Sequence, residues 1–550
     1  MRGRLDRSNL MKATSPKFQV SGFILAISYW LLAISSAQAQ QKNLPLNREW
    51  GLKIECSLNK LDSLQCTSLK PYIESATMKP GIGRFGTYSY NSSRATSRSL
   101  PTYGDFSWFY RKLRRDNLIV VNDTTDKFLL TIDPLFNFEY GKDLADSSNS
   151  FYKNTRGILV RGDIGKQFSF ETSFLENQAT FVDYIKDFND AYKVIPGQGR
   201  WKKFKTTGYD FAMASGYVSY SPSKHFNFQA GHGKHFIGDG YRSLLLSDNA
   251  FNYPFARITS TFGKIQYTNL YVSFMNLNYG GVTTPPGTEP LFQKKAGNFQ
   301  FLSWNVHKRI QLGFFQGLIW KSSDSTNQQC LKLAYASPVI YTAALSEGLK
   351  GTNNVILGAT LKFKITNSIS LYGQYMMDDQ KKTGFQVGTK YFDVLGISNL
   401  HLQLEYNQAD AYSYASTNPS QSYTHYNQPL SHPLGANFSE GIAFLNYRIG
   451  DFFTDVKFNY AKTGADHSGL NYGNNIFASD TLYIPSNKNN WERTLRIIDF
   501  HLGYLINPST NLNIFAGISN RSSVSPAENS QTNFVYFGIR TSLNNTYYDF

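Results

Sequence analysis

Between residues 231 and 243 the sequence GHGKHFIGDGYRS concentrates side chains that could bind a polar ligand. Four glycines alternate with basic, acidic and hydroxyl-bearing residues, directly after the strand-like stretch 226–229. This composition predicts a tight loop in which the backbone approaches another backbone or a ligand. A polar surface of this kind could contact sugar hydroxyls and carboxylates through Lys234, Asp239, Tyr241 and Arg242. A hydrogen-bonded turn that faces the protein interior and binds nothing is the alternative.

A second polar stretch, YTHYNQPLSHPLGAN, runs from residue 423 to residue 437. Aromatic rings and planar polar side chains are well suited to carbohydrate, so the candidate binding residues here are Tyr423, His425, Asn427 and His432. The two prolines indicate an irregular loop rather than a strand. A loop that folds into the interior without a ligand is again the alternative.

Neither stretch matches a known catalytic or cofactor-binding motif. The chain has no GxSxG or HExxH sequence, and the first stretch lacks the GxxxxGK[ST] order of a phosphate-binding loop. The two histidines of the first stretch have no carboxylate or thiol at a standard metal-ligand spacing. We therefore predict a protein that is not an enzyme and uses no metal or cofactor. An enzymatic alternative would pair Ser243 or Ser431 with His425 or His432.

The chain contains three cysteines. Cys56 and Cys66 are close in sequence, and Cys330 is remote. In an oxidising compartment the close pair predicts a disulfide between Cys56 and Cys66, with two free thiols as the alternative.

The first 39 residues have the order of a secretory signal peptide. Basic residues precede an apolar core at 20–34, and Ala37-Gln38-Ala39 has small residues at the spacing of a signal-peptidase site. The apolar core is short for a membrane span. We expect residues 1–39 to be removed and the mature chain to begin near Gln40, with Met11 as an alternative translation start.

The elements that must position these candidates are predicted to be strands. Aromatic and polar residues alternate at 136–140 and 168–174, and apolar and polar residues alternate at 400–407 and 535–543. Such period-two alternation indicates half-buried strands. The chain is 15% aromatic, with 36 Tyr and 42 Phe, yet its mean hydropathy is only −0.36. No run of about 18 apolar residues follows the leader.

This combination predicts an all-β fold: a large antiparallel transmembrane β-barrel of the outer membrane, with short periplasmic or plug helices. We place the barrel at residues 126–550, where the length allows on the order of 16 to 20 strands. Residues 40–125 are expected to form a separate N-terminal periplasmic segment, which includes the basic and aromatic run 108–115. A large secreted β-sandwich or propeller would share part of this profile.

One segment departs from the alternation. Aromatic and apolar residues recur at helical spacing between Phe181 and Tyr192, and Pro196-Gly197 follows. The spacing predicts a short amphipathic helix that either plugs the barrel or packs at its periplasmic mouth.

The final residue, Phe550, is predicted to close the last amphipathic strand. A terminal aromatic of this kind is what the outer-membrane assembly machinery reads, so that machinery is an expected partner during insertion.

The charge of the chain restricts its expected partners. The formal net charge is +16, and it falls to about +12 when the five basic residues and one acid of the leader are removed. This excess favours anionic partners such as lipopolysaccharide phosphates or acidic polysaccharide. We expect no nucleic-acid partner, because no recognised nucleic-acid-binding motif accompanies the charge.

Several long stretches resemble a known family. Residues 212–220, 231–249 and 423–437, with 130–136 and 194–200, are similar to the Wzi-type capsule assembly family, in its Bacteroidota branch related to the gliding motility protein RemB. The resemblance implies a barrel of about 18 strands. It also implies helices that plug the periplasmic side, and a lectin that holds capsular polysaccharide at the cell surface.

The expected function is therefore the binding of surface or capsular polysaccharide in support of capsule or slime attachment. The gliding branch adds a link to motility as an expectation. A porin-like transport channel is the alternative, because barrels of this size can enclose water.

Overall fold

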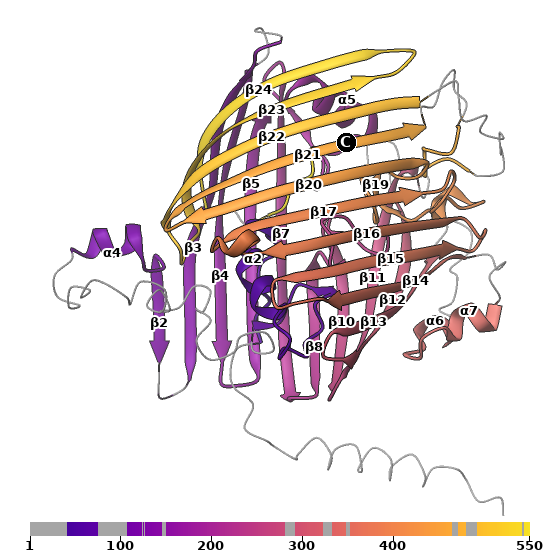
Figure 1. Ribbon diagram of the computed structural model, residues 1–550, viewed down its shortest axis with the longest axis horizontal. Helices are drawn as coiled ribbons and strands as arrows, with labels where there is room; N and C mark the ends of the chain where they lie inside the picture. Colours follow the sequence, from indigo (N-terminus) through magenta and orange to yellow (C-terminus); the bar gives the residue numbers. More distant parts are fainter. Residues whose placement is uncertain are drawn as a thin grey trace, which may run out of the picture.

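The computed structural model describes residues 41–74, 107–123, 125, 127–145, 150–280, 292–322, 333–347, 353–464, 471–479, 492–541 and 544–550. The predicted signal peptide and Cys330 lie outside these residues. Within them the chain forms a closed antiparallel barrel of 18 strands, which confirms the predicted fold class (Figure 1).

The barrel strands run in chain order, and β24 pairs with β3 to close the ring. They are β3 (Phe128–Asp143), β4 (Ser150–Ile164), β5 (Phe168–Thr180), β7 (Gly208–Ser223), β8 (Phe226–Gly233), β10 (Tyr253–Phe262), β11 (Ile265–Gly280), β12 (Phe292–His307), β13 (Ile310–Lys321), β14 (Asn354–Lys364), β15 (Ile369–Asp378), β16 (Thr383–Phe392), β17 (Leu400–Ala409), β20 (Phe438–Ile449), β21 (Phe452–Gly464), β22 (Glu492–Asn507), β23 (Leu512–Val524) and β24 (Asn529–Arg540). Two short strands, β2 (Ile119–Asp123) and β6 (Lys202–Phe204), extend the wall beside β3 and β7.

The strands carry polar side chains inward and apolar side chains outward. In β16, for example, Gln386 is 1% exposed inside the barrel, whereas its neighbour Val387 is 58% exposed on the outer wall. The alternation at 400–407 has the same sense, with Glu405 buried and Leu404 exposed. A closed barrel whose outer wall is apolar satisfies its own backbone hydrogen bonds and presents hydrocarbon to lipid, as outer-membrane barrels do. The protein is therefore an outer-membrane β-barrel.

The helices of the structure are short. Among the helices of the described ranges, none is both long and apolar enough to cross a membrane.

The connections at the two ends of the barrel differ in length. At one end they are short, as at 165–167 and 263–264. At the other end several are long, as at 181–207 and 410–437, whereas 379–382 and 525–528 are short. Periplasmic turns of outer-membrane barrels are short and extracellular loops are longer. We therefore assign the short-turn end to the periplasm and the long-connection end to the cell exterior.

The interior of the barrel is filled by four segments, which we call the plug. The plug consists of residues 41–74, 234–252, 410–437 and 544–550. Its parts pair with one another: β1 (Leu69–Lys70) pairs with β9 (Phe236–Ile237), and the Tyr414 hydroxyl donates to the backbone oxygen of Leu244. Leu244 is fully buried in an apolar core that spans the plug and the inner wall.

The N-terminal segment differs from the prediction. Instead of forming a separate periplasmic unit, residues 41–74 lie inside the barrel, where Lys42 forms a 2.8 Å ion pair with Asp163 of β4. Helix α2 (Arg48–Leu58) belongs to this segment and lies at the short-turn end, next to Asn367. Polar side chains that point inward from the strands bind this segment. These partners are distant in sequence, so the sequence of the segment alone could not indicate them.

The prediction for Phe550 is wrong. The last strand ends at Arg540, and the C-terminal tail turns back into the lumen. There the Phe550 ring packs 4.8 Å from the ring of Phe188, and the backbone oxygen of Tyr548 accepts a hydrogen bond from Tyr184. The tail therefore follows the last strand as part of the plug.

The helix predicted between 181 and 192 is confirmed as α5 (Asp183–Tyr192). Lys193 ends it in the left-handed conformation, and its aromatic face packs on the C-terminal tail. Because it lies in a long connection, α5 is at the exterior end and not at the periplasmic mouth. The plug helices implied by the resemblance are thus divided, with α2 at one end and α5 at the other.

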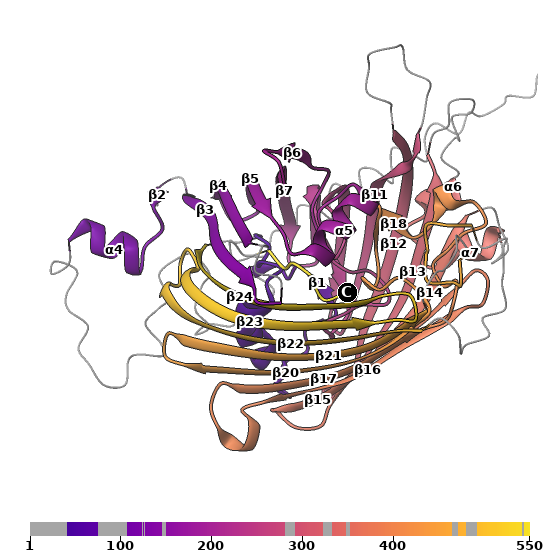
Figure 2. The same cartoon turned by 90° about the horizontal axis from the view of Figure 1, so that it is seen from above.

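Three helices lie outside the barrel wall in both views (Figure 2). Helix α4 (Trp108–Arg114) extends from the short-turn end beside β2. Helices α6 (Leu333–Ala336) and α7 (Thr342–Glu347) lie against the outer face of β11 to β14.

Candidate functional site

The candidate residues of the first polar stretch are buried in the plug. Arg242 is 1% exposed and forms ion pairs of 3.0 Å with Glu440 of β20 and 3.1 Å with Asp549 of the C-terminal tail. Burial alone would lower the pKa of Arg242, but Asp549 and Glu440 raise it above its usual value. The Tyr241 hydroxyl donates to the other oxygen of Asp549 at 2.8 Å. These two residues therefore attach the C-terminal tail to the barrel wall.

Asp239 performs a similar task for the N-terminal segment. Its carboxylate accepts hydrogen bonds of 2.5 Å from the hydroxyls of Thr67 and Ser68, and it lies 3.4 Å from the ammonium of Lys362 on β14. Burial would raise the pKa of Asp239, but Lys362 and Lys70 hold it below its usual value. The carboxylate thus remains charged and holds residues 67–68 against the wall.

Lys234 links two further loops through backbone oxygens. Its ammonium donates to Gly197 at 2.7 Å and to Asp248 at 3.1 Å. Burial lowers the pKa of Lys234 to about 8, and the nearby charge of Asp248 opposes this effect. Gly197 follows α5, so Lys234 connects the α5 connection to the plug.

The second polar stretch is also folded into the lumen. The Tyr423 hydroxyl donates to the backbone oxygen of Leu245 at 2.6 Å. His432 contacts Glu440 at 2.6 Å through Nε2, while its Nδ1 accepts from the backbone N–H of Leu434. Burial lowers the pKa of His432, although Glu440 opposes the shift. The Glu440 carboxylate therefore binds both Arg242 and His432. One carboxylate of the barrel wall thus connects the two polar stretches.

His425 is held as a neutral ring. Its Nδ1 accepts from the backbone N–H of Met275 at 3.0 Å, and its Nε2 lies 3.1 Å from the backbone oxygen of Asn252, to which it donates. Burial lowers the pKa of His425 to about 3. Its contacts join the second stretch to β11 and to the connection that precedes β10.

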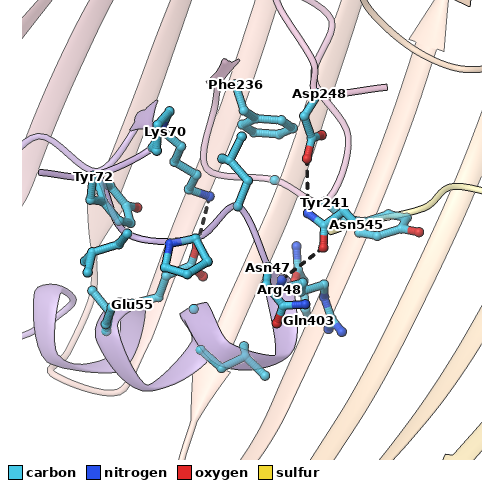
Figure 3. A pocket seen from close by; sticks show the side chains of 18 of the residues that line it. Asn47, Arg48, Glu55, Lys70, Tyr72, Phe236, Tyr241, Asp248, Gln403 and Asn545 are labelled. Carbon is cyan, nitrogen blue, oxygen red and sulfur yellow. Dashed lines mark hydrogen bonds and ion pairs between the residues drawn. The ribbon is translucent and has the colours of Figure 1, made fainter. Parts of the chain in front are cut away.

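One interior cavity lies beside this network (Figure 3). It has a volume of about 70 Å³, well below the several hundred Å³ of ligand pockets. Glu55 forms ion pairs of 2.8 Å with Lys70 and 2.6 Å with Lys390, and the Arg48 guanidinium lies 3.6 Å from the centre of the Phe444 ring. Because its size is small and its charges are already paired, we interpret it as a packing gap.

A larger cavity opens at the exterior end, and we call it the mouth pocket. Its volume is about 340 Å³, within the range of ligand pockets. Helix α5 supplies aromatic rings on one side, and inward-facing residues of β22 and β23 supply arginines on another. It is lined by Tyr184, Asp187, Phe188, Ala191, Tyr192, Asn427, Pro429, Pro433, Leu434, Gly435, Asn474, Asn475, Ile476, Phe477, Arg493, Arg521, Ser523, Ser525, Glu528, Ser530 and Phe550.

Arg521 is one polar group of the mouth pocket that has a donor without a partner. It is 5% exposed, its guanidinium lies 4.1 Å from the centre of the Tyr184 ring, and its Nε and Nη2 donate to the backbone oxygen of Phe550. Its Nη1 is buried and has no hydrogen-bond partner in the structure. A buried guanidinium donor without a partner is costly, so a ligand oxygen that reached it would be favoured.

Aromatic rings line the mouth pocket next to this arginine. The rings of Tyr192 and Phe477 lie 5.4 Å apart, and the ring of Phe188 is 4.6 Å from that of Tyr192. Asn427 also lines the pocket, and its side-chain amide donates to the backbone oxygen of Tyr192 at 2.9 Å. Asn427 is thus the sequence candidate that reaches the mouth pocket, whereas Arg242, Asp239 and the others make plug contacts.

Sequence reasoning missed the arginines of the mouth pocket. Arg493 and Arg521 lie at inward-facing positions near the exterior ends of β22 and β23. Arg493 shares a face of β22 with buried Ile497, and Arg521 shares a face of β23 with buried Ser523. A cation on the polar face of an amphipathic strand could have indicated them. Their convergence on α5 required the fold.

The predicted disulfide is not formed, because Cys56 and Cys66 are both free thiols. Cys56 lies on α2, close enough to Asp393 to interact with its charge. Cys66 forms a hydrogen bond with the side chain of Ser303 on β12. The two residues face different parts of the wall, which separates their sulfur atoms. Within the described residues, no group of three or more His, Cys, Asp or Glu side chains is placed to hold a metal ion.

Two further residues of the enzymatic alternative, Ser243 and His432, have structural contacts. The Ser243 hydroxyl donates to the backbone oxygen of Ile237 at 2.6 Å. His432 is engaged with Glu440.

No protein-family model matches the chain, and no curated protein matches it. Among solved structures it is similar to Wzi, a carbohydrate-binding β-barrel of the outer membrane involved in group 1 capsule assembly in Escherichia coli. That likeness has 13% identity and a TM-score of 0.48, over 74% of this chain and 84% of that chain. It is also similar to OccAB2 of Acinetobacter baumannii (10% identity, TM-score 0.41, 75% of this chain and 97% of that chain) and to OprD of Pseudomonas aeruginosa (10% identity, TM-score 0.40, 75% and 94%). At these values the likeness concerns the barrel fold alone.

Proposed function

We propose that this protein is a non-enzymatic surface protein that binds exopolysaccharide in its mouth pocket and helps to attach a capsule or slime layer to the cell. The observation that carries this proposal is the pairing of aromatic rings with a buried, partly unpaired guanidinium in a pocket that opens at the exterior end.

The chemistry of the pocket suits a sugar chain. The apolar C–H faces of a sugar ring can pack on Tyr192 and Phe477, which present large rigid surfaces. The guanidinium groups of Arg493 and Arg521 line the pocket and can donate to a sugar hydroxyl or carboxylate, and guanidinium–carboxylate bonds are among the stronger protein hydrogen bonds. Asp187 and Glu528 at the rim can accept from further hydroxyls. The excess positive charge of the chain favours an anionic polymer.

The filled lumen supports attachment rather than transport. Plug segments with fully buried leucines and a paired charge network lie between the two ends of the barrel. A polymer held at the mouth would therefore stay outside the cell.

A binding experiment tests the proposal directly. The folded barrel is titrated calorimetrically with surface polysaccharide purified from the cells that make it. We expect Phe477→Ala and Arg521→Gln each to weaken binding about tenfold, which corresponds to about 1.4 kcal/mol. Phe204→Ala and Lys203→Gln, on the neighbouring β6 turn, are matched controls and should bind like the parent. Absence of binding by the parent protein would overturn the proposal.

Two further predictions from the sequence can be checked with the same material. A reproducible hydrolysis of lipid or glycan that is lost in Ser243→Ala or Ser431→Ala would contradict the non-enzymatic assignment. A link to gliding predicts slower colony spreading in cells that lack the protein. Normal spreading of those cells would contradict the link.

A further inference from the structure

Helix α4 exposes an unusual density of aromatic side chains. Trp108 is 60% exposed and Phe109 is 67% exposed, and Tyr110 and Leu113 are also exposed. Ser107 caps the helix by accepting from the backbone N–H of Tyr110, so this arrangement is a formed element. An apolar surface of this density on so short a helix would be unfavourable in water, which indicates that something covers it.

The same helix carries a cluster of cations. Arg111, Lys112 and Arg114 occupy its last turn, and Arg115 follows directly. At 100° per residue, Phe109, Tyr110 and Leu113 share one side of the helix, and Arg111, Lys112 and Arg114 lie on the other side together with Trp108. Arg115 ends the helix with non-helical backbone angles and forms a 3.0 Å ion pair with Asp116. The helix is therefore amphipathic, with an aromatic face and a basic face.

Contacts with the barrel fix α4 at the lipid-facing wall. The Arg114 guanidinium donates to the Tyr504 hydroxyl at 3.0 Å, and Tyr504 lies on the outward face of β22 with the exposed residues Phe500 and Leu502. The ring of Tyr504 packs 4.8 Å from that of Phe452, which is 64% exposed. Tyr504 and Phe452 stand at the short-turn end, where an aromatic girdle marks the edge of the membrane.

Hydrogen bonds to the backbone make this placement rigid. The Asn507 side chain donates to the backbone oxygens of Lys112 and Asp116, and the Ser509 hydroxyl donates to that of Arg115. Asn507 is the last residue of β22, and Ser509 lies in the turn between β22 and β23. The chain that follows α4 exposes Ile119 and Val121 on β2, which extends the apolar surface along the wall (Figure 2).

We propose that α4 is an interfacial anchor that binds anionic phospholipid in the periplasm-facing leaflet of the outer membrane. Its aromatic face enters the boundary between headgroups and acyl chains, and its basic face contacts lipid phosphates. Aromatic residues are enriched at this boundary, and clustered Lys and Arg beside a membrane segment attract anionic headgroups. The proposal is independent of the mouth pocket, which lies at the opposite end of the barrel.

The depth of position 109, on the aromatic face, tests the aromatic part of the proposal. The full mature barrel is folded into phosphatidylcholine vesicles containing phosphatidylglycerol, and the emission that Phe109→Trp adds to the Trp108→Phe variant is taken as the signal of position 109. We expect at least half of this signal to be quenched by lipids brominated on their acyl chains and little of it by aqueous iodide. Quenching by iodide and not by brominated lipid would place position 109 in water or against a protein and would overturn the proposal.

Lipid selectivity tests the basic part. Native mass spectrometry counts phosphatidylglycerol and phosphatidylcholine retained by the detergent-solubilised barrel. We expect the parent to retain phosphatidylglycerol at least threefold better, and the variant R111Q/K112Q/R114Q/R115Q to lose this preference. The variant K193Q/K202Q/K203Q/K205Q removes the same charge at the opposite end and should behave like the parent. Each variant is first shown to fold by its heat-dependent migration in gels. A preference that survives in the α4 variant, or is equally lost in the control, would overturn the proposal.

Discussion

At the residue scale, the stability of the plug depends on a few buried ion pairs. Arg242 is the cation shared by Glu440 and Asp549, so its loss would leave buried carboxylates without their main partner. Breaking one side of such a group costs about 3–5 kcal/mol. We expect Arg242→Gln to lower the free energy of unfolding in guanidinium chloride by about this amount. Lys203→Gln, at an exposed position, should change it by less than about 0.5 kcal/mol. If Arg242→Gln had the same free energy of unfolding as the parent protein, the ion pairs of Arg242 with Glu440 and Asp549 would not stabilise the plug.

The neutral His425 ring makes stability depend on pH. Its pKa in the folded protein is about 3, below the value of about 6.5 for an unfolded chain. Between these values the unfolded state binds more protons, so the free energy of unfolding falls as pH falls. We expect His425 to contribute a loss of up to about 1.4 kcal/mol per pH unit between pH 6.5 and pH 4.5. Burial also lowers the pKa of His235 and His432, so these two rings add to the fall. His425→Asn should reduce this slope, and His307→Asn, at the exposed end of β12, should leave it unchanged. Equal slopes in all three proteins would contradict the argument.

At this scale the sequence left two alternatives open for the polar groups of 231–243, a bound ligand or a hydrogen-bonded interior turn, and the structure shows protein partners for Asp239, Tyr241 and Arg242. The glycines, charges and hydroxyls of 231–243 did indicate a close approach of backbone and polar groups. Their partners lie far away along the chain, since Glu440 is 198 residues from Arg242 and the backbone oxygen of Asp549 is 307 residues away. Local spacing cannot distinguish a ligand from a distant strand that supplies the same chemical groups.

At the element scale, the α6–α7 hairpin covers an irregularity in the outer wall. Four amides point outward from β11 to β13, where lipid-facing residues should be apolar; they are Asn269, Asn298, Gln300 and Gln316. The Asn298 side chain donates to the backbone oxygen of Tyr335, and Gln300 to that of Ser337, each at 2.7 Å. An amide without a hydrogen-bond partner in hydrocarbon costs several kcal/mol. The hairpin avoids this cost because its backbone oxygens accept hydrogen bonds from Asn298 and Gln300.

The hairpin therefore contributes to stability through Tyr335. Its ring is 3% exposed and lies 5.2 Å from that of Trp320. We expect Tyr335→Ala to lower the free energy of unfolding by about 2–4 kcal/mol, because it removes a buried aromatic ring. Leu345→Ala, at an 83% exposed position of the same hairpin, is the matched control and should have little effect. Similar small effects of both changes would mean that the hairpin does not protect the wall.

The elements themselves were the most predictable feature. Period-two alternation identified strands such as β17 and β24, and helical spacing identified α5, because both patterns are set by neighbours in sequence. The return of the C-terminal tail and of residues 41–74 into the lumen was not predictable in this way. Those segments are held by contacts with many different strands, as Lys42 is by Asp163.

At the scale of the whole molecule, the plug occupies much of the barrel lumen in the described residues, and a cavity of about 320 Å³ remains between the plug and the inner wall beside Glu49, His501 and Tyr184. The plug places fully buried side chains such as Leu245 and Tyr423 between the two ends. We expect the folded protein in planar bilayers to show no steady conductance, because the packed plug narrows the path for water and ions through the lumen. Stable, voltage-independent current steps from the purified barrel would contradict the filled lumen and favour a transport channel.

The central claim is that the mouth pocket holds polysaccharide on the cell. The most direct test measures surface polysaccharide that is cell-associated and surface polysaccharide released to the medium. It compares the parent strain, a strain lacking the protein, and strains carrying Phe477→Ala together with Arg521→Gln or the paired controls Phe204→Ala and Lys203→Gln. We predict that the deletion strain and the pocket variant make the same total amount but release most of it, while the control strain retains it. Unchanged retention in the deletion strain would contradict the claim.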